Sequence, residues 1–321
     1  MPTVFFATNR VLTGPADRPG SYSATIQPPS QFGDMIYGTA FVDSVNVAAN
    51  NAGTISRIEN TNTGSFGDNV TGDLTNAGRN LLVFIHGFAN TFTDGITRAA
   101  FNRDWMAQSG IPAADCTVLA FSWPSRGQLF SLPIPQLAYL QDQHMASASG
   151  LHLMTFLSRI EPILLAARAN NCRTFLLAHS MGNLALESAV ENWFLHGNGS
   201  AALFDLAILA AGDCRFNCFN APEPARMSGL KRLSERISIY YSHDDNVLHL
   251  SQVVNAGAQR LGQDGPFHRA DATLFPPGRF RMFDASDCHD YPFDVMTSHQ
   301  YYRLSPLVRG EIAADMGGPV A

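Results

Sequence analysis

The sequence predicts an α/β fold in which a mostly parallel central sheet is covered by helices on both faces. Short apolar runs recur along the chain, as expected of strands that are buried on both faces. From residue 81 onward these runs alternate with longer segments of helical periodicity. No internal repeat is visible, and 321 residues suffice for one large domain. We therefore expect residues 1–321 to form a single domain.

The N-terminal segment is expected to add strands to this sheet. Residues 3–9 and 37–45 have the apolar composition that is typical of strands. Residues 46–80 are rich in Asn, Gly, Thr, Asp and Ser, which is the composition of loops and turns. We expect this stretch to be a loop-rich insertion that contains no more than a short strand at 54–59.

The centre of the sheet is expected after residue 80, where strands and helices alternate. The expected strands are 81–85, 117–123, 172–178, 203–211, 237–242 and 280–285. The expected helices are 93–109, 136–170, 181–195 and 246–258. Pro162 should divide the longest of these helices, because proline removes a backbone hydrogen bond.

The composition excludes several classes of function. The net charge of −6 provides no basic face for nucleic acid. No apolar run reaches the ~18 residues of a membrane span, and the N-terminus lacks the pattern of a signal peptide. Five scattered cysteines indicate a reducing, cytoplasmic location. Cys214 and Cys218 fit no zinc template, so we expect neither metal nor cofactor. The oligomeric state is left open.

The sharpest local signal is a serine at the corner between a strand and a helix. Ser180 follows the apolar run 174–179 and precedes the apolar-periodic segment 181–195. A tight turn of this kind requires small residues two positions before and after the serine. Gly182 meets this requirement, and Ala178 replaces the usual first glycine. The pattern predicts a nucleophile elbow in which the Met181 N–H, at the start of the helix, stabilises an oxyanion.

A second signal, His86-Gly87-Phe88, directly follows the strand at 81–85. The loop after this strand supplies the second oxyanion donor in enzymes with such an elbow. Gly87 lets the backbone bend, so the Phe88 N–H is the predicted donor. His86 precedes Ser180 in the chain, which is the wrong order for the base, and we expect it to brace the loop.

At this point the sequence resembles the bacterial α/β hydrolases grouped as domain of unknown function 900. The resemblance extends over residues 3–303 and implies the α/β-hydrolase fold and ester-type hydrolysis, but no particular substrate. It is carried by His86-Gly87, Phe121-Ser122-Trp123-Pro124-Ser125, His179-Ser180-Met181-Gly182-Asn183, Ser242-His243-Asp244-Asp245 and His299-Gln300-Tyr301-Tyr302.

The acid and the base of the triad should follow the elbow, in the order Ser, Asp, His. Asp245 follows the strand at 237–242 and matches the family turn, so it is the preferred acid. Asp244 and Asp213 are the alternatives. His299 matches the family's late histidine and is the preferred base. His289, nearer to the end of the last strand, is the alternative base.

The substrate pocket is predicted from composition. Residues 124–150 contain apolar residues between prolines and are expected to form a small cap, the alternative being a crossover that packs on the core. Phe130 and Leu132 would line the pocket, and Trp123 would flank the oxyanion site. Asp142 shows no partner in the sequence and is expected to cap a helix.

These residues together predict a serine hydrolase that cleaves a small-molecule carboxylic ester through an acyl-enzyme. A thioesterase, an acyltransferase or an amidase would use the same triad. A catalytically silent binding protein on this scaffold is the alternative from another class, since fold alone does not fix function. Dehalogenase and epoxide hydrolase chemistry is disfavoured, because those enzymes carry Asp at the elbow.

Overall fold

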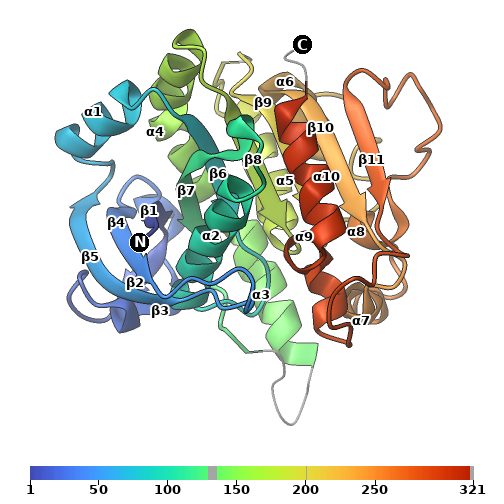
Figure 1. Cartoon of the computed structure of the whole chain (residues 1–321), viewed down its shortest axis with the longest axis horizontal. Helices are drawn as coiled ribbons and strands as arrows, with labels where there is room; N and C mark the ends of the chain where they lie inside the picture. Colours follow the sequence, from blue (N-terminus) through green and yellow to red (C-terminus); the bar gives the residue numbers. More distant parts are fainter. Residues whose placement is uncertain (129–135, 200, 319–321) are drawn as a thin grey trace.

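The computed structural model describes residues 1–128, 136–199 and 201–318. Its centre is a nine-stranded sheet with the order β11-β10-β9-β8-β6-β7-β1-β4-β5 (Figure 1). The strands are β1 (Thr3–Thr8), β4 (Ile36–Asp43), β5 (Thr54–Thr63), β6 (Asn80–Ile85), β7 (Cys116–Ser122), β8 (Thr174–His179), β9 (Phe204–Ala210), β10 (Ser234–Tyr241) and β11 (Phe280–Asp284). A separate hairpin pairs β2 (Arg10–Leu12) with β3 (Tyr22–Ile26).

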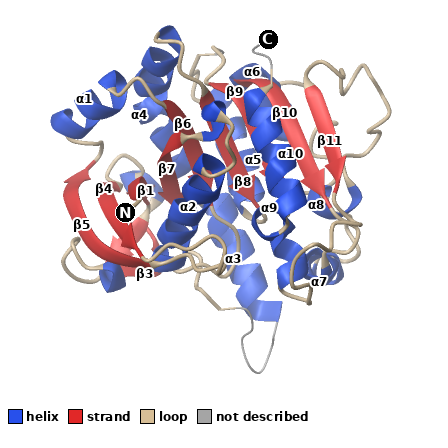
Figure 2. Cartoon of the chain, viewed as in Figure 1, coloured by secondary structure: helices blue, strands red, loops and turns tan. Residues whose placement is uncertain are grey.

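The seven strands β11-β10-β9-β8-β6-β7-β1 are neighbours in this order and pair in parallel. At the β1 edge, β4 and β5 are added in antiparallel pairing. Figure 2 shows helices on both faces of this sheet. The longer helices are α1 (Asp68–Asn76), α2 (Phe92–Ala107), α3 (Gln136–Ala148), α4 (Gly150–Ala169), α5 (Gly182–Leu195), α7 (Asn246–Val254) and α10 (Pro306–Gly317). The predicted α/β-hydrolase architecture is therefore confirmed.

Burial explains why the central strands read as continuous apolar runs. Every residue of β8 and β9 is buried, because each strand is covered on both faces. One core, on the side of α4 and α5, includes Phe156 and Leu186. The other core, on the side of α2 and α10, includes Phe101 and Ile312.

The insertion at 46–80 is more ordered than its composition suggests. It contains β5 and α1 in addition to loops. β5 lies at the edge of the sheet with one face exposed, so its polar residues resemble those of a loop. α1 fully buries only Val70 and Leu74, which are spaced by one helical turn and give a weak sequence signal.

The predicted helix at 136–170 is divided, but not at Pro162. α3 ends at Ala148 and α4 begins at Gly150, whereas Pro162 lies inside α4. A Cβ at Gly150 would lie 2.0 Å from the Ser188 Oγ of α5. The break therefore lies where α4 packs closely against α5, and Pro162 is accommodated inside α4.

α4 is also the described helix that is long and apolar enough to cross a membrane, with a mean hydropathy of 1.2 over its best window. That window is 61% buried in the protein. Leu153, Phe156 and Leu164 all lie in the core. The apolar composition of α4 is explained by packing between the sheet and neighbouring helices.

Candidate active site

Ser180 lies at the corner between β8 and α5, at the carboxyl edge of the sheet. Its φ is +56°, a left-handed conformation that a non-glycine residue adopts only at a cost. Backbone contacts hold it there: the Ser180 N–H donates to Ala210 O at 3.0 Å, and the Ser180 carbonyl accepts from the Asp213 N–H at 3.0 Å. The Asn183 side chain donates to the same carbonyl at 3.1 Å. The strained turn is thus fixed by its surroundings.

Two glycines allow the turn to pack tightly against the loop that follows β6. A Cβ at Gly87 would lie 2.6 Å from the Ser180 Cβ. A Cβ at Gly182 would lie 2.6 Å from His86 O and 2.7 Å from Ile85 O. Both distances are shorter than real Cβ contacts, so the elbow and the loop can approach one another only because neither position carries a side chain.

The two predicted oxyanion donors start from these same segments. Met181 immediately precedes α5, whose positive dipole end faces the turn. Phe88 follows Gly87, whose missing side chain lets this loop approach Ser180. Among the described residues, neither the Phe88 N–H nor the Met181 N–H has a hydrogen-bond acceptor within the protein. Both donors are therefore available to a ligand atom at the corner.

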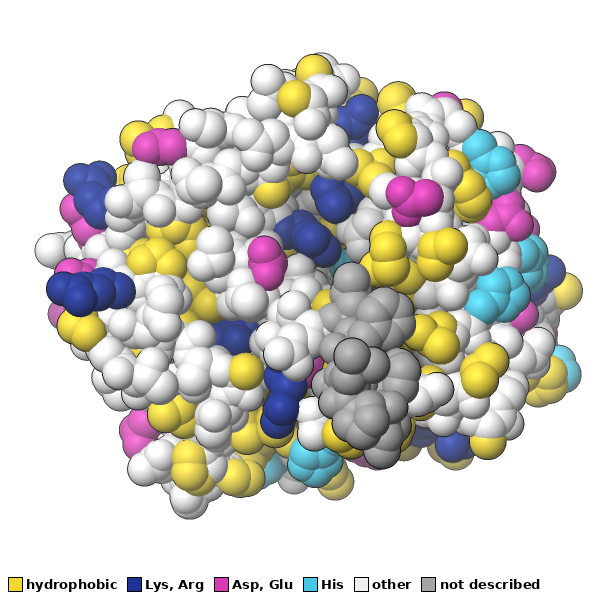
Figure 3. Space-filling model, turned by 90° about the horizontal axis from the view of Figure 1, so that it is seen from below, with side chains coloured by type: hydrophobic (Ala, Val, Ile, Leu, Met, Phe, Trp, Pro, Cys, Tyr) yellow, Lys and Arg dark blue, Asp and Glu magenta, His cyan; other side chains and the backbone are white. Residues whose placement is uncertain are grey.

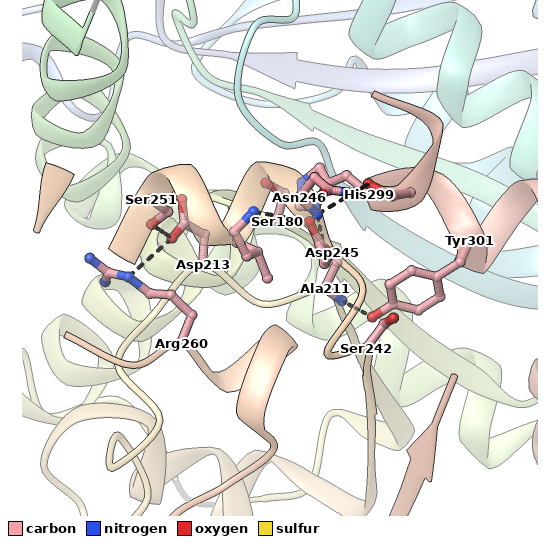
Figure 4. Close-up of polar contacts among 12 residues, drawn as sticks. Ser180, Ala211, Asp213, Ser242, Asp245, Asn246, Ser251, Arg260, His299 and Tyr301 are labelled. Atoms are coloured by element: carbon pink, nitrogen blue, oxygen red, sulfur yellow. Dashed lines mark hydrogen bonds and ion pairs between the residues drawn. The ribbon is translucent and has the colours of Figure 1, made fainter. Parts of the chain in front are cut away.

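Asp245 and His299 form a buried pair beside the elbow (Figure 4). The His299 Nδ1 lies 2.7 Å from the Asp245 Oδ2, and the side chains are 6% and 0% exposed. The other carboxylate oxygen of Asp245 accepts from the Leu248 N–H at 3.0 Å, so Asp245 also caps α7. An ionised carboxylate oxygen can only accept a hydrogen bond, so the Nδ1 of His299 carries the proton in this contact. The Nε2 of His299 is buried and has no partner among the described residues.

His179 links the elbow to the loop that carries His299. Its Nε2 lies 3.1 Å from the backbone oxygen of His299, which can only accept, so Nε2 donates. The two imidazole rings are 4.8 Å apart, and His179 also packs against Tyr302 at 4.4 Å. Burial lowers the pKa of His179 well below its ordinary value, which keeps the ring neutral. The residue before Ser180 thus holds the predicted base in place.

Asp213, the alternative acid, is occupied elsewhere. Its Oδ2 accepts from the Tyr139 hydroxyl at 2.8 Å and its Oδ1 accepts from the Ser251 hydroxyl at 2.6 Å. The Arg260 Nε lies 3.6 Å from Oδ1 (Figure 4). Burial raises the pKa of Asp213, and the nearby Arg260 opposes this shift. The structure therefore places Asp213 in a polar wall next to Ser180, with its carboxylate bound by groups other than His299.

The other two alternatives, Asp244 and His289, are brought together with each other. The His289 Nε2 lies 2.9 Å from the Asp244 Oδ2, and the side chains are 48% and 44% exposed. Asp244 therefore points to solvent, although it directly precedes Asp245. The structure assembles the preferred acid with the preferred base and leaves the alternative pair on the surface.

Of the three predicted pocket residues, the structure describes only Trp123. Trp123 is fully buried: its ring stacks on His86 at 5.1 Å, and its Nε1 donates to His86 O at 2.8 Å. It therefore supports the loop after β6 from within the core, and its side chain has no exposed surface toward a ligand. Phe130 and Leu132 lie outside the described residues. Of the predicted cap at 124–150, α3 is described, and its Tyr139 packs on Phe88 at 5.7 Å.

Several residues near the site were not predicted from sequence. Asp142 is an example: it is buried inside α3 and not at its start, so it does not cap that helix. It accepts instead from the Arg126 N–H at 3.1 Å and from the Ala89 N–H at 3.4 Å. An acidic residue on the apolar face of a helix is a signal for such a buried role, but its partners are distant in sequence. Among the described residues, no cluster of His, Cys, Asp and Glu could hold a metal ion.

A serine presented at the carboxyl edge of a parallel sheet, on a strained turn between strand and helix, defines the class of α/β hydrolases. Within this class, the chain belongs to the family described as alpha/beta hydrolase of unknown function (DUF900), whose family model matches residues 62–313. Membership of this family supports hydrolase activity. No curated protein matches the chain.

Proposed function

We propose that this protein is a serine hydrolase that cleaves carboxylic esters through an acyl-enzyme. The observation that carries the proposal is the buried 2.7 Å contact between Asp245 and His299 next to the strained Ser180 turn. A histidine with Nδ1 protonated and Nε2 free is ready to accept a proton.

The proposed reaction has two halves. The His299 Nε2 takes the proton of the Ser180 hydroxyl as its oxygen attacks the ester carbonyl, and the Phe88 and Met181 N–H groups stabilise the oxyanion. Asp245 holds the imidazole in place and stabilises its positive charge. His299 then protonates the departing alcohol, which leaves an acyl group on Ser180. Water, activated by the same histidine, releases the acid and restores the enzyme.

The surface near the site supports an apolar or amphipathic ester. The carboxyl ends of the strands, α3 and α7 lie at the bottom of Figure 1, and Figure 3 views this side. Exposed apolar side chains gather there beside polar ones. Those near His299 in sequence or on α7 include Leu250, Val253, Val295 and Met296. Phe130 and Leu132 remain our proposal for the acyl pocket.

A fluorophosphonate probe and a panel of matched esters and thioesters, from acetyl to dodecanoyl, test the proposal. We expect Ser180→Ala to abolish both labelling and ester hydrolysis, because no second group could replace the nucleophile. Ser188→Ala is the matched control: Ser188 is a half-buried serine of the same helix whose hydroxyl donates to Ser147 O at 3.0 Å, and the variant should keep wild-type activity. Each methylene of the acyl chain that is buried in the pocket should raise kcat/KM up to a few-fold, because burying one methylene contributes about 0.8 kcal/mol. Full activity in Ser180→Ala would refute the proposal, and a strong preference for thioesters would make the protein a thioesterase.

A further inference from the structure

The orientation of the Phe88 N–H is set by contacts on the opposite side of its peptide group. The Gly87 carbonyl accepts from the Asn90 Nδ2 at 2.9 Å and contacts the His86 Nδ1 at 2.9 Å. In a planar trans peptide, the C=O and the following N–H point in opposite directions. Two donors on the Gly87 oxygen therefore fix the direction in which the Phe88 N–H points.

The Asn90 side chain holds the backbone of this loop, and one of its own polar atoms is left without a partner in the described part of the chain. Its Nδ2 also donates to the Phe88 carbonyl at 2.7 Å, so one amide group binds two successive carbonyls of the loop. Its Oδ1 is buried and has no partner among the described residues. An unpaired buried acceptor is unfavourable. A side chain chosen for stability alone would not leave this oxygen unpaired.

Asn90 and the neighbouring Ala89 are held by three segments that are distant in sequence. The Asn90 N–H donates to the Ser125 hydroxyl oxygen at 3.0 Å, and the Asn90 carbonyl accepts from the Arg10 Nη2 at 3.0 Å. Ser125 in turn donates to Asp142, which also accepts from the Ala89 N–H. The loop is therefore fixed from the β1–β2 segment, from the segment after β7, and from α3.

Arg10 is almost completely buried, and its guanidinium bonds Asn90, the end of β7 and the segment after it, and β3. Its Nε donates to the Ser122 hydroxyl at 3.2 Å, and its Nη1 donates to Ser125 O and Ser23 O at 3.1 Å. Burial lowers the pKa of Arg10 to about 9, which leaves it charged at neutral pH, and the Asp142 carboxylate opposes the shift. A buried charge of this kind is expensive unless it is fully bonded.

We propose that Arg10, Asn90, Ser125 and Asp142, the oxyanion-loop clamp, are positioning residues that pre-set the Phe88 N–H for the oxyanion. This inference rests on the proposed ester hydrolysis, in which Phe88 is a donor. No member of the clamp needs to touch substrate. Rigid donors stabilise a transition state because they do not reorganise during the reaction. Loosening the clamp should therefore lower kcat far more than it raises KM.

The test compares Asn90→Ala with Asn102→Ala. Asn102 is a buried asparagine on α2 that accepts from the Trp105 Nε1 at 3.2 Å, remote from the loop. We expect Asn90→Ala to lower kcat at least about 10-fold with little change in KM, and to weaken a trifluoromethyl ketone inhibitor by a similar factor. Asn102→Ala should lose comparable thermal stability without either effect. Equal kinetic losses in both variants would reduce Asn90 to a structural residue.

The order parameter of the Phe88 amide, measured by NMR relaxation, separates this inference from the proposed function. It should fall from about 0.85 towards about 0.6 in Asn90→Ala, and stay unchanged in Asn102→Ala. Ser125→Ala, a milder change to the clamp, should shift it in the same direction and covers the case in which Asn90→Ala does not fold. An unchanged order parameter overturns the clamp. A lowered order parameter in a protein that hydrolyses no ester keeps the clamp and overturns the proposed function.

Discussion

Two carboxylate–histidine pairs of this protein have adjacent aspartates in the sequence and very different surroundings. Asp245 pairs with His299 at 2.7 Å, and Asp244 pairs with His289 at 2.9 Å. By contact distance alone they are nearly equivalent. The first pair is buried next to Ser180, whereas both side chains of the second are almost half exposed.

The difference arises from the turn that follows β10. Asp245 occupies the position before α7, where its carboxylate caps the helix and points inward. Asp244 lies one residue earlier and points to solvent, where water and salt weaken its interaction with His289. An Asp–His contact by itself therefore does not identify a catalytic pair, and it is burial beside Ser180 that distinguishes these two pairs.

The largest difference between the pairs should appear when each histidine is removed. We expect His299→Ala to lower kcat by about 10³-fold or more, because the nucleophile loses its base. His289→Ala should leave kcat within about two-fold, because surface substitutions remote from the site rarely matter. Steady-state kinetics on a short-chain ester measure both. A crippled His289→Ala variant would exchange the roles of the two pairs.

Replacing each aspartate by asparagine should give the same contrast, because Asp245 determines which ring nitrogen of His299 carries the proton. In Asp245→Asn, the amide oxygen can keep the bond to the Leu248 N–H, which turns the NH₂ group toward His299 Nδ1. Nδ1 must then accept, so the proton moves to Nε2 and the ring cannot take the serine proton. We expect kcat to fall at least about 10²-fold with an unchanged circular dichroism spectrum.

Asp244→Asn is the matched control and should retain kcat. Asp213→Asn tests the remaining alternative acid and should cost less than Asp245→Asn, because Asp213 binds Tyr139, Ser251 and Arg260. If Asp213→Asn proved the more damaging of the two, the acid would lie one strand earlier than we propose.

Burial of His86 should also make the stability of the protein fall at acidic pH. Burial lowers the pKa of His86 to about 3, with a further contribution from Arg10. The unfolded chain binds a proton at this residue below about pH 6.5, and the folded chain does not, so stability falls as pH decreases between these values. Each such histidine contributes up to about 1.4 kcal/mol per pH unit. Urea unfolding at several pH values should show a shallower dependence of the unfolding free energy on pH in His86→Gln than in the wild type, and equal slopes in the two proteins would contradict the account.

The smallest expected effect concerns the helix cap alone. Asp245→Ser keeps a good capping side chain for α7 and removes the carboxylate from His299. It should therefore be more stable than Asp245→Ala by about 1 kcal/mol, yet equally inactive. Asp244→Ala should change the free energy of unfolding by no more than about 0.5 kcal/mol. Parallel changes in stability and activity across the Asp245 variants would tie the loss of activity to folding.

The sequence by itself determined the fold class and the strand–helix corner at which Ser180 lies. Both depend on local patterns. β8 is a continuous apolar run because its residues are buried on both faces. Glycine occupies position 182, two residues after Ser180, because the turn tolerates no Cβ there. The preferred acid and base, Asp245 and His299, were chosen from chain order and family likeness, and the structure brings them together. Their catalytic roles remain our proposal.

Only the tertiary structure decided which residues of the same type face inward. Asp244 and Asp245 are identical and adjacent, and the packing of α7 gives only one of them a buried position. Asp142 showed no partner in the sequence and Arg10 gave no signal there, because the groups that bind them are separated from them by stretches of chain. Periodicity in sequence reports burial along one element, whereas a buried polar network forms between elements. Its members could be recognised only after the sheet and helices had brought them together.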